Sequence, residues 1–309
     1  MAKLKDLALI PEQLSGGHRL CPGCGIPQIV RLGLRMTDSH LVVGAATGCL
    51  EVSTTIYPYT AWKCSFIHNA FENVAASVSG AEAAYRALQK RGKMKHPYKF
   101  IAFGGDGGTY DIGLQALSGA LERGHRMLYI CLDNGAYMNT GIQRSSATPM
   151  GASTTTSPAG KVSPGKMQWR KDLAAIVAAH RIPYVAQASP SNWRDYMIKV
   201  KKALAADGPS FINVISTCHR GWRSKPSQAI ATLRPAVDSC YWPLYEIENG
   251  KLTITYKPKV KVPVTDWLKK QGRFAHLFKP APNEAMLTAF QERVDLEWER
   301  LLKQEQCGL

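Results

Sequence analysis

An aspartate between two glycines and a distant asparagine are the first residues of this sequence whose types and spacing could do chemistry. Gly105-Asp106-Gly107 follows one run of apolar residues, and Asn134 follows another. A carboxylate and an amide carbonyl are hard oxygen ligands of the kind that Mg²⁺ binds. Glycines beside them let the backbone approach a phosphate group closely. Together these residues predict a site where a metal ion holds a diphosphate.

The segments around these residues decide how specific the motif is, because Gly-Asp-Gly alone is also a common turn. Residues 99–103 and 126–132 are strand-like, and a helix-like segment at 111–123 joins them. A strand that ends in GDG, a crossing helix and a second strand that ends in DN form the pattern of thiamine-diphosphate enzymes. We therefore predict that the GDG turn and Asn134 bind thiamine diphosphate and its Mg²⁺.

Closely spaced cysteines form the second candidate site. Cys21-Pro22-Gly23-Cys24 could hold zinc, form a redox pair or bind an iron–sulfur cluster, and Cys49 and Cys218 could supply two further ligands. A redox pair usually follows a strand, and no convincing strand precedes Cys21. Spacing alone does not separate zinc from iron–sulfur. The remaining cysteines are expected to be small buried side chains: Cys64, Cys131, Cys240 and Cys307.

The elements that must position these residues alternate along the chain, which predicts an α/β fold with a mostly parallel sheet and helices on both faces. The expected strands are 41–46, 99–103, 126–132, 183–188 and 211–216. The expected helices are 69–91, 111–123, 172–180, 191–206 and 283–304. Cys49, Asp106, Asn134 and Cys218 each follow a strand closely, so they should meet at the carboxyl edge of the sheet, where ligands bind.

Three parts of the chain are expected to differ in role. Residues 1–40 carry the CxxC motif, residues 41–225 form the thiamine-diphosphate-binding α/β domain, and residues 226–309 form an irregular C-terminal extension for subunit contact. Within the second part, the polar stretch 139–166 is predicted to be a functional loop, because it is long and has no period. Asn69 and Glu72 predict a capping box at the start of the helix over 69–91.

Composition excludes several classes of function. Thirty-nine Lys and Arg against 23 Asp and Glu give a net charge of +16, which attracts anionic cofactors and acidic partners. The basic residues are dispersed and no zinc-finger or RNP-type motif occurs, so nucleic acid is not an expected partner. No segment reaches the roughly 20 apolar residues of a membrane span, and no signal peptide is recognisable. We expect a cytoplasmic protein without membrane contact.

Long stretches of the sequence closely resemble the β subunit of pyruvate:ferredoxin oxidoreductases, from about residue 15 to residue 278. The similar stretches are HRLCPGCG (18–25), ATGCLEV (46–52), YPYTAWKCSFIHNAFENVAASVSGAEAAYRAL (57–88), FGGDGGTYDIGLQALSGALERG (103–124), DNGAYMNTGIQRSSATPMGASTTTSPAGK (133–161), TCHRGWRS (217–224), WPLYEIENG (242–250) and QGRFAHL (271–277).

The resemblance implies roles for particular residues. The 4Fe–4S cluster would be bound by Cys21, Cys24, Cys49 and Cys218. The Mg²⁺ would be bound by Asp106, Asn134 and the backbone carbonyl of Ala136. Gly48 and Cys49 would lie against the cofactor, beside Gly105 and Gly107. Asn139 would face the diphosphate and the substrate, and it is the candidate catalytic residue of this chain.

The resemblance also implies an activity and partners. The chain would be the β subunit of a 2-oxoacid:ferredoxin oxidoreductase, active only with α-type and γ/δ-type subunits, because the glutamate that activates thiamine lies in another subunit. Pyruvate would give acetyl-CoA and CO₂ with coenzyme A, or oxalate would give CO₂ alone. Electrons would pass through the cluster to ferredoxin. The alternative is a non-redox thiamine-diphosphate decarboxylase with a structural zinc at the cysteines.

Departures from the resemblance leave the substrate open. Gly135 stands where the pyruvate enzymes are expected to have Glu, and His219-Arg220 stands where Pro-Thr is expected. Ser65-Phe66-Ile67 replaces an expected Pro-Trp before His68. A less negative site would favour the oxalate dianion over the pyruvate monoanion. Pyruvate and oxalate are therefore both predicted substrates.

Overall fold

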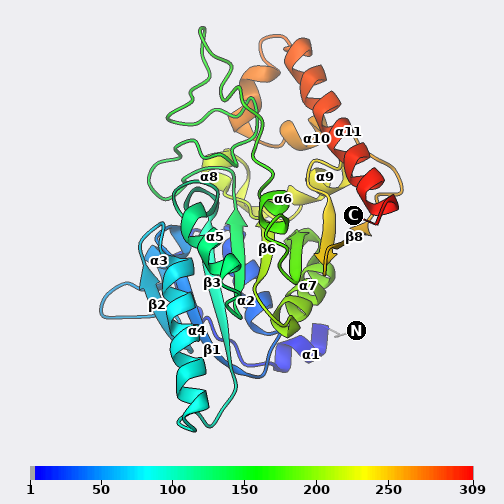
Figure 1. Cartoon of the computed structure of the whole chain (residues 1–309). Coiled ribbons are helices and arrows are strands. Elements are labelled where there is room, and N and C mark those ends of the chain that lie inside the picture. Colours follow the sequence, from blue (N-terminus) through cyan, green and yellow to red (C-terminus); the bar gives the residue numbers. More distant parts are fainter. Residues whose placement is uncertain (1–3, 309) are drawn as a thin grey trace.

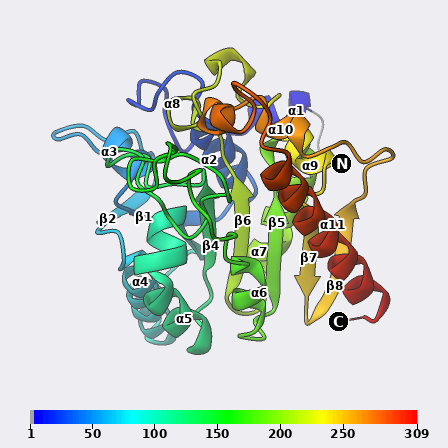
Figure 2. The same ribbon diagram turned by 90° about the horizontal axis from the view of Figure 1, so that it is seen from above.

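The computed structural model of the protein describes residues 4–308 and contains one eight-stranded sheet in the order β2-β1-β3-β4-β6-β5-β7-β8 (Figures 1 and 2). The first three residues of the expected N-terminal segment and the last residue of the C-terminal extension lie outside the described residues. The strands are β1 (His40–Ala46), β2 (Ser65–Asn69), β3 (Tyr98–Gly105), β4 (Leu128–Asp133), β5 (Tyr184–Ala188), β6 (Ser210–Ile215), β7 (Leu244–Glu248) and β8 (Lys251–Tyr256). The first six strands are parallel to one another. β7 pairs antiparallel with β5, and β8 pairs antiparallel with β7. The α/β class with a mostly parallel sheet is confirmed.

Two apolar cores cover the two faces of the sheet, because successive side chains of a strand point to opposite faces. In β3, Ile101 packs into one core and Phe100 into the other. Helices α2 (Ile26–Leu34) and α7 (Trp193–Ala205) cover the first face. Helices α4 (Val74–Lys90), α5 (Leu114–Glu122), α6 (Leu173–Ala178) and α11 (Glu284–Gln306) cover the second. In Figure 1, α4 and α5 lie in front of the sheet and α2 lies behind it.

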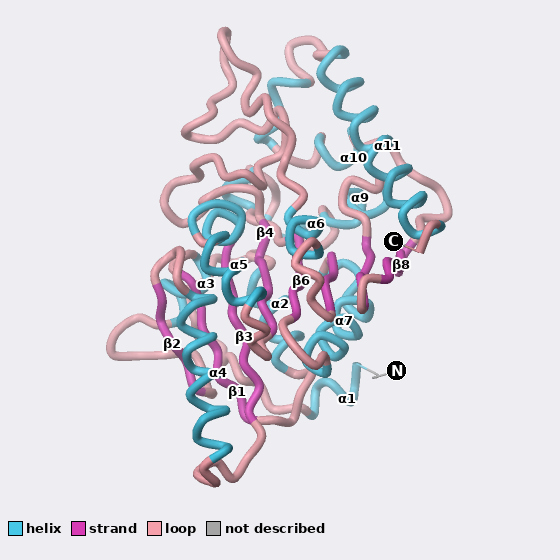
Figure 3. The backbone as a smooth tube through the Cα atoms, in the orientation of Figure 1, coloured by secondary structure: helices cyan, strands magenta, loops and turns pink. Residues whose placement is uncertain are grey.

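A third apolar cluster lies beyond the carboxyl ends of the strands and is rich in tryptophan. Trp222, Trp242 and Trp267 are each about 99% buried there, with 1% of their surface exposed. The cluster is built from short elements and one end of α11: α8 (His219–Trp222), α9 (Leu233–Asp238), α10 (Thr265–Leu268) and the 3₁₀-helix Gly272–Leu277. The loops of this end stand together above the sheet in Figure 3. They include residues 139–166, which contain no helix or strand, as expected.

The structure differs from the sequence expectations at three places. Asn69 ends the edge strand β2, which was not expected, and α4 begins later, after Asn73, so the predicted capping box is wrong. The helix expected over 111–123 is a π-helix, Gly107–Ile112, followed by α5. The C-terminal extension is not irregular, because β7, β8 and several helices continue the fold.

The strand order places a topological switch point between β1 and β3. The chain leaves β1 for β2 on one side and returns through α4 to β3 on the other. In open parallel sheets a crevice forms at the carboxyl ends of two such strands, and ligands bind there. Cys49 begins α3 (Cys49–Thr54) directly after β1, and Asp106 directly follows β3. The candidate residues therefore flank the crevice.

No helix within residues 4–308 is long and apolar enough to span a membrane.

Candidate thiamine-diphosphate and cluster site

A cleft opens at the switch point between β1 and β3. Three chain segments form most of its lining: residues 46–50 at the end of β1, residues 103–108 at the end of β3, and residues 132–140 at the end of β4 apart from Asp133 and Gly135. Ile26 and Phe71 complete it. The lining thus includes Gly48, Cys49, Gly105, Asp106, Gly107, Asn134, Ala136 and Asn139. Asn139 is exposed at this lining, whereas Asp106 has only 1% of its surface exposed. Every residue proposed from the sequence to contact thiamine diphosphate belongs to this one cleft.

Three oxygen-bearing groups converge at the base of the cleft. One amide atom of Asn134 lies 2.9 Å from the carbonyl oxygen of Ala136 and 3.0 Å from Oδ1 of Asp106. If this atom is nitrogen, it donates a hydrogen bond to each oxygen. If it is oxygen, it faces the other two oxygens without a proton between them. Neighbouring ligands of octahedral Mg²⁺, at 2.0–2.1 Å from the ion, stand about 3.0 Å apart. The observed distances therefore fit an Mg²⁺ bound by these three groups.

The Asp106 carboxylate is held in an environment that disfavours its charge. Burial raises the pKa of Asp106 well above its usual value, and the nearby Asp133 carboxylate raises it further. The hydroxyl of Ser145 and the backbone N–H of Asn134 donate to Asp106 and partly oppose the rise. A bound cation inverts this balance, because its charge stabilises the carboxylate. The arrangement thus fits a metal ligand better than a surface acid.

The two glycines of the GDG turn have different surroundings: Gly107 is closely packed, and Gly105 borders open space. A Cβ at Gly107 would lie 2.3 Å from the ring of Tyr137, so no larger residue fits there. A Cβ at Gly105 would meet nothing within 4 Å. The π-helix begins at Gly107, and the first N–H groups of a helix have no partner within it. These N–H groups are suited to anions such as phosphate.

The four candidate cluster cysteines come from three separate segments that pack together. Gly25, directly after the CxxC motif, approaches the Cys218 segment so closely that a Cβ there would lie 2.9 Å from the backbone nitrogen of Thr217. The N–H of Gly25 also donates to the carbonyl of Thr217 at 3.2 Å. Cys49 reaches the same region from the end of β1. Chain contacts that spacing could not reveal therefore bring the CxxC motif next to the Cys218 segment, and Cys49 of this group lines the cleft.

The four sulfurs lie near enough to one another for their charges to affect the thiol pKa values. Burial, together with the smaller effect of the neighbouring sulfurs, raises the pKa of Cys24 and of Cys49 to about 12. For Cys49 these neighbours are Cys218, Cys24 and Cys21. Burial also raises the pKa of Cys218, although its Sγ accepts a hydrogen bond from Gly221 N at 3.4 Å. Cationic iron would stabilise the thiolates that this environment otherwise disfavours.

The spacing of the cysteines bears on which metal they could bind. A zinc ion needs its sulfur ligands about 2.3 Å from a single point. Within residues 4–308, no group of three or more His, Cys, Asp or Glu side chains is arranged to hold one ion. In a 4Fe–4S cluster each cysteine binds a different iron, so the four sulfurs stand farther apart. Four cysteine thiolates are the donor set that a 4Fe–4S cluster uses. Of the other cysteines, Cys131 is buried within β4 as expected, whereas Cys307 is exposed.

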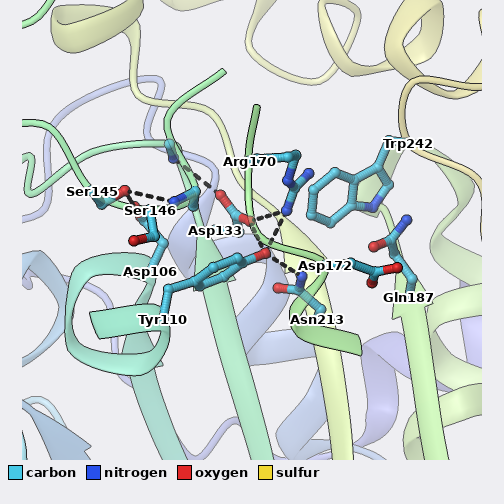
Figure 4. A network of polar contacts seen from close by, with 12 residues as sticks. Asp106, Tyr110, Asp133, Ser145, Ser146, Arg170, Asp172, Gln187, Asn213 and Trp242 are labelled. Carbon is cyan, nitrogen blue, oxygen red and sulfur yellow. Dashed lines mark hydrogen bonds and ion pairs between the residues drawn. The ribbon is translucent and has the colours of Figure 1, made fainter. Parts of the chain in front are cut away.

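A buried polar network behind the cleft was missed by the sequence analysis (Figure 4). Asp133 Oδ2 accepts from the hydroxyl of Tyr110 and from the guanidinium of Arg170, both at 2.7 Å. Arg170 lies over the ring of Trp242, 4.3 Å from its centroid. Asp133 was visible in the sequence as the neighbour of Asn134. No local pattern marked Arg170, because it follows the irregular loop. This network fixes the end of β4, from which Asn134 projects.

Met138 is a second residue that the sequence analysis did not assign. It lines the cleft, and it also packs against the Cys218 segment, where a Cβ at Gly221 would lie 2.2 Å from its sulfur. Met138 thus separates the cleft from Cys218, while Cys49 lines the cleft directly. The cysteine site and the cleft therefore share one wall.

Known proteins with similar sequences agree with this geometry. Residues 46–214 match the family model described as thiamine pyrophosphate enzyme, C-terminal TPP binding domain. The pyruvate synthase subunit PorB of Thermotoga maritima is 54% identical over 299 residues, which cover 95% of this chain and 92% of that protein. PorB of Pyrococcus furiosus is 46% identical and covers 90% and 91%, respectively. The ketoisovalerate oxidoreductase subunit VorB of Pyrococcus abyssi is 43% identical and covers 94% and 93%.

The chain belongs to the β-subunit family of 2-oxoacid:ferredoxin oxidoreductases. It is a thiamine-diphosphate-binding subunit of a multi-subunit oxidoreductase, as the resemblance implied, and the non-redox decarboxylase alternative is not favoured. The solved structure of 2-oxoglutarate:ferredoxin oxidoreductase from Magnetococcus marinus matches with a TM-score of 0.54 over 72% of this chain and 79% of that chain. At 21% identity that match supports the fold.

The departures that left the substrate open lie outside the cleft of this β subunit. The described residues that line the cleft do not include Gly135, His219-Arg220 or Ser65-Phe66-Ile67. Gly135 faces the opposite side of its turn, where a Cβ would lie 3.0 Å from the guanidinium of Arg273. His68 pairs with the buried Glu51 on α3. The loss of an acid at position 135 therefore does not change the charge of the cleft lining.

Proposed function

We propose that this β subunit holds thiamine diphosphate, Mg²⁺ and one 4Fe–4S cluster in a pyruvate:ferredoxin oxidoreductase. The observation that carries the proposal is the convergence of Asp106, Asn134 and Ala136 at the base of the cleft whose wall contains Cys49. Thiamine diphosphate, when bound, supplies the electron sink for oxidative decarboxylation of a 2-oxoacid. The cluster would supply one-electron transfer, and ferredoxin would accept the electrons.

The chain's own residues would bind and orient the cofactors. Asp106, the amide oxygen of Asn134 and the carbonyl of Ala136 would hold Mg²⁺ and, through it, the diphosphate. The open space at Gly105 would admit the phosphates to the backbone. Asn139, exposed in the cleft lining, would contact the diphosphate and the substrate. Cys21, Cys24, Cys49 and Cys218 would bind the cluster at the shared wall.

Pyruvate is the favoured substrate of the two. The cleft lining carries no departure that would favour a dianion, and relatives named pyruvate synthase subunits are 46–54% identical over most of their length. Pyruvate oxidation would require coenzyme A as acyl acceptor. The test uses the purified native complex and measures viologen reduction with pyruvate plus coenzyme A, and separately with oxalate. Turnover with oxalate and none with pyruvate would overturn this assignment.

The activating carboxylate would come from an α-type subunit. Glu51 is 3% exposed, its Oε1 pairs with His68 and Thr55, and it is not part of the cleft lining. Glu72 is exposed and likewise lies outside the lining. A carboxylate that protonates or deprotonates the aminopyrimidine must reach it directly. We also propose γ/δ-type subunits, contact through residues 226–309, and a cytoplasmic location.

This subunit arrangement has a direct test. Residues 1–309 are produced alone, reconstituted anaerobically with thiamine diphosphate, Mg²⁺, iron and sulfide, and assayed for substrate-dependent viologen reduction. We expect a visible absorption that bleaches on reduction, which reports the cluster, but no turnover until the α-type subunit is added. Turnover equal to that of the whole complex would show that this chain contains the activating carboxylate and would refute the arrangement.

A further inference from the structure

A short turn, residues 145–148, contacts both chain segments that carry the proposed Mg²⁺ ligands. Its first residue, Ser145, donates from its hydroxyl to Oδ2 of Asp106 (Figure 4). Its last residue, Thr148, donates from its hydroxyl to the carbonyl oxygen of Gly135 at 2.8 Å. The turn thus joins the GDG segment after β3 to the ligand-bearing segment after β4 by two side-chain hydrogen bonds.

The turn is closed on itself and is held from behind by a buried lysine. The N–H of Thr148 donates to the carbonyl oxygen of Ser145 at 3.2 Å, and the N–H of Ser145 donates to Oγ1 of Thr148 at 2.9 Å. Nζ of Lys166 donates to two carbonyl oxygens of the turn, those of Thr148 at 2.6 Å and Ser146 at 3.3 Å. Ser145, Thr148 and Lys166 each have no more than 1% of their surface exposed. Because a buried, well-bonded polar network is rigid, the Ser145 hydroxyl is held in one place.

The surroundings of the Ser145 hydroxyl assign its single proton to Asp106. A serine hydroxyl has one proton to donate and can accept through its lone pairs. Oγ of Ser145 accepts from the backbone N–H of Ala147 at 3.2 Å. Two acceptors are in reach of its proton, Oδ2 of Asp106 at 2.5 Å and Oγ1 of Thr148 at 3.4 Å. The carboxylate is the nearer of the two, and hydrogen bonds to a charged acceptor are the stronger ones.

The two carboxylate oxygens of Asp106 therefore have different surroundings. Oδ2 accepts from the Ser145 hydroxyl. Oδ1 accepts from the backbone N–H of Asn134 at 3.2 Å and lies 3.0 Å from the amide atom of the Asn134 side chain. That amide atom also lies 2.9 Å from the carbonyl oxygen of Ala136. The Ser145 hydroxyl thus fixes the rotation of the carboxylate and leaves Oδ1 as the oxygen that faces the other proposed ligands.

We infer that Ser145 makes Asp106 a one-oxygen ligand and thereby shifts the preference of the metal site from Ca²⁺ towards Mg²⁺. Mg²⁺ requires near-ideal octahedral geometry at about 2.0–2.1 Å, which suits one fixed oxygen from each ligand. Ca²⁺ binds at about 2.3–2.6 Å and can take both oxygens of a carboxylate. The hydrogen bond to Oδ2 opposes this second mode. Ser145 acts through Asp106 and is a positioning residue, and the inference rests on the proposed Mg²⁺ ligands.

The test compares the two metals on the purified complex, freed anaerobically of thiamine diphosphate and divalent metal. Mg²⁺ or Ca²⁺ is titrated with excess thiamine diphosphate, and the bound thiamine diphosphate is measured after rapid gel filtration. Each titration gives a half-saturating metal concentration without any measurement of turnover. Ser145→Ala should raise this concentration for Mg²⁺ about 10–100-fold, the usual loss when a hydrogen-bond partner of a metal ligand is removed. The value for Ca²⁺ should change less than about threefold, because the freed Oδ2 can also bind this ion.

Two further variants separate this effect from a general loosening of the turn. Ser146→Ala is the matched control, because it removes the neighbouring hydroxyl, which donates to Asp111. It should leave the half-saturating concentrations of both metals unchanged. Ser145→Thr keeps the hydroxyl and adds a methyl group in a buried position, so it tests crowding without loss of the donor. The unfolding temperature of this variant should fall, whereas the ratio of its Ca²⁺ and Mg²⁺ values should stay that of the wild type.

The outcomes distinguish a failure of this inference from a failure of the proposed ligands. If Ser145→Ala weakens Mg²⁺ and Ca²⁺ equally, Ser145 supports only the shape of the site, and the inference is overturned. Unchanged values for both metals in Ser145→Ala would overturn it as well. If instead Asp106→Asn keeps metal-dependent binding of thiamine diphosphate, the proposed ligands are wrong and the role of Ser145 falls with them.

Discussion

Replacement of Asp106 by Asn should change stability and cofactor binding in opposite directions. In the metal-free protein the carboxylate is 1% exposed, and burial together with Asp133 raises its pKa. A carboxyl group whose pKa is raised on folding stabilises the folded state at low pH, and this contribution is lost as pH rises through the raised pKa. Asn has no such charge, and Ser145 can still form a hydrogen bond with it. The metal-free variant should therefore be as stable as the wild type at low pH and more stable at neutral pH.

The cofactor-bound protein should behave in the reverse way. Of the three groups proposed to bind Mg²⁺, Asp106 carries the only negative charge, so its loss should abolish binding of the Mg²⁺ complex. A ligand present at 100 times its Kd stabilises a protein by about 2.7 kcal/mol. With an unfolding entropy of about 2.1 cal/mol/K per residue, a chain of 309 residues should gain about 4 °C in its unfolding midpoint. The Asn variant should gain nothing.

Calorimetry with and without thiamine diphosphate and Mg²⁺, together with the measured cofactor content, tests both halves of this prediction. Asp111→Asn is the matched control, because Asp111 lies in the π-helix that directly follows Asp106 and its carboxylate accepts from Ser146. It should keep the cofactor-dependent gain. The reasoning is refuted if the Asp106 variant retains that gain, or if the metal-free variant is less stable than the wild type at neutral pH.

The remaining predictions concern the cysteines and two buried charges. Cys218→Ser should remove the cluster absorption and electron transfer to ferredoxin, whereas Cys131→Ser, within β4, should keep both; equal iron loss in the two would exclude the ligand assignment. Asp133→Asn should lower the free energy of unfolding by about 3–5 kcal/mol, because it leaves Arg170 buried without a carboxylate partner. In urea unfolding, the double variant with Arg170→Met should recover part of this loss. If the two single effects on the free energy of unfolding simply add, the pairing is contradicted. Burial lowers the pKa of Lys166 from 10.5 to about 8. Below pH 8 the buried ammonium lowers the free energy of unfolding, and this loss disappears as pH rises towards 10.5. The wild type should therefore gain up to about 3 kcal/mol relative to Lys166→Met between pH 8 and 10.5, and a pH-independent difference would refute the charge assignment.

Local signals were sufficient to predict the GDG turn and Asn134. Both stand at the ends of buried strands, and the ends of neighbouring parallel strands meet at one edge of the sheet. The meeting of Cys24 with Cys218 could not be derived in this way, because it depends on a close backbone contact between Gly25 and Thr217. Spacing left zinc and iron–sulfur open, and the resemblance to a known family was needed to favour the cluster.

Other features were missed for two different reasons. The strand β2 is an edge strand whose side chains are mostly half-exposed or exposed, so it has no apolar period to detect. The hairpin of β7 and β8 did have a signal. Asn249-Gly250, both with positive φ, follows LYEIE and precedes the alternating KLTITY, and Asn-Gly between such segments is a strong hairpin signal. The roles of Arg170 and Lys166 depend on their burial, which only the tertiary structure reveals.

The antiparallel hairpin means that residues 226–309 cannot be removed without exposing the edge of the parallel sheet. It pairs with β5, which would otherwise present a row of free N–H and C=O groups at the margin of the parallel sheet. The new margin, β8, is closed in turn by α11, where Glu305 accepts from the backbone N–H of Ile254 at 2.7 Å. A chain shortened after residue 225 should therefore self-associate through β5. Fusions to other subunits are better placed after α11, because β8 then keeps its contact with Glu305.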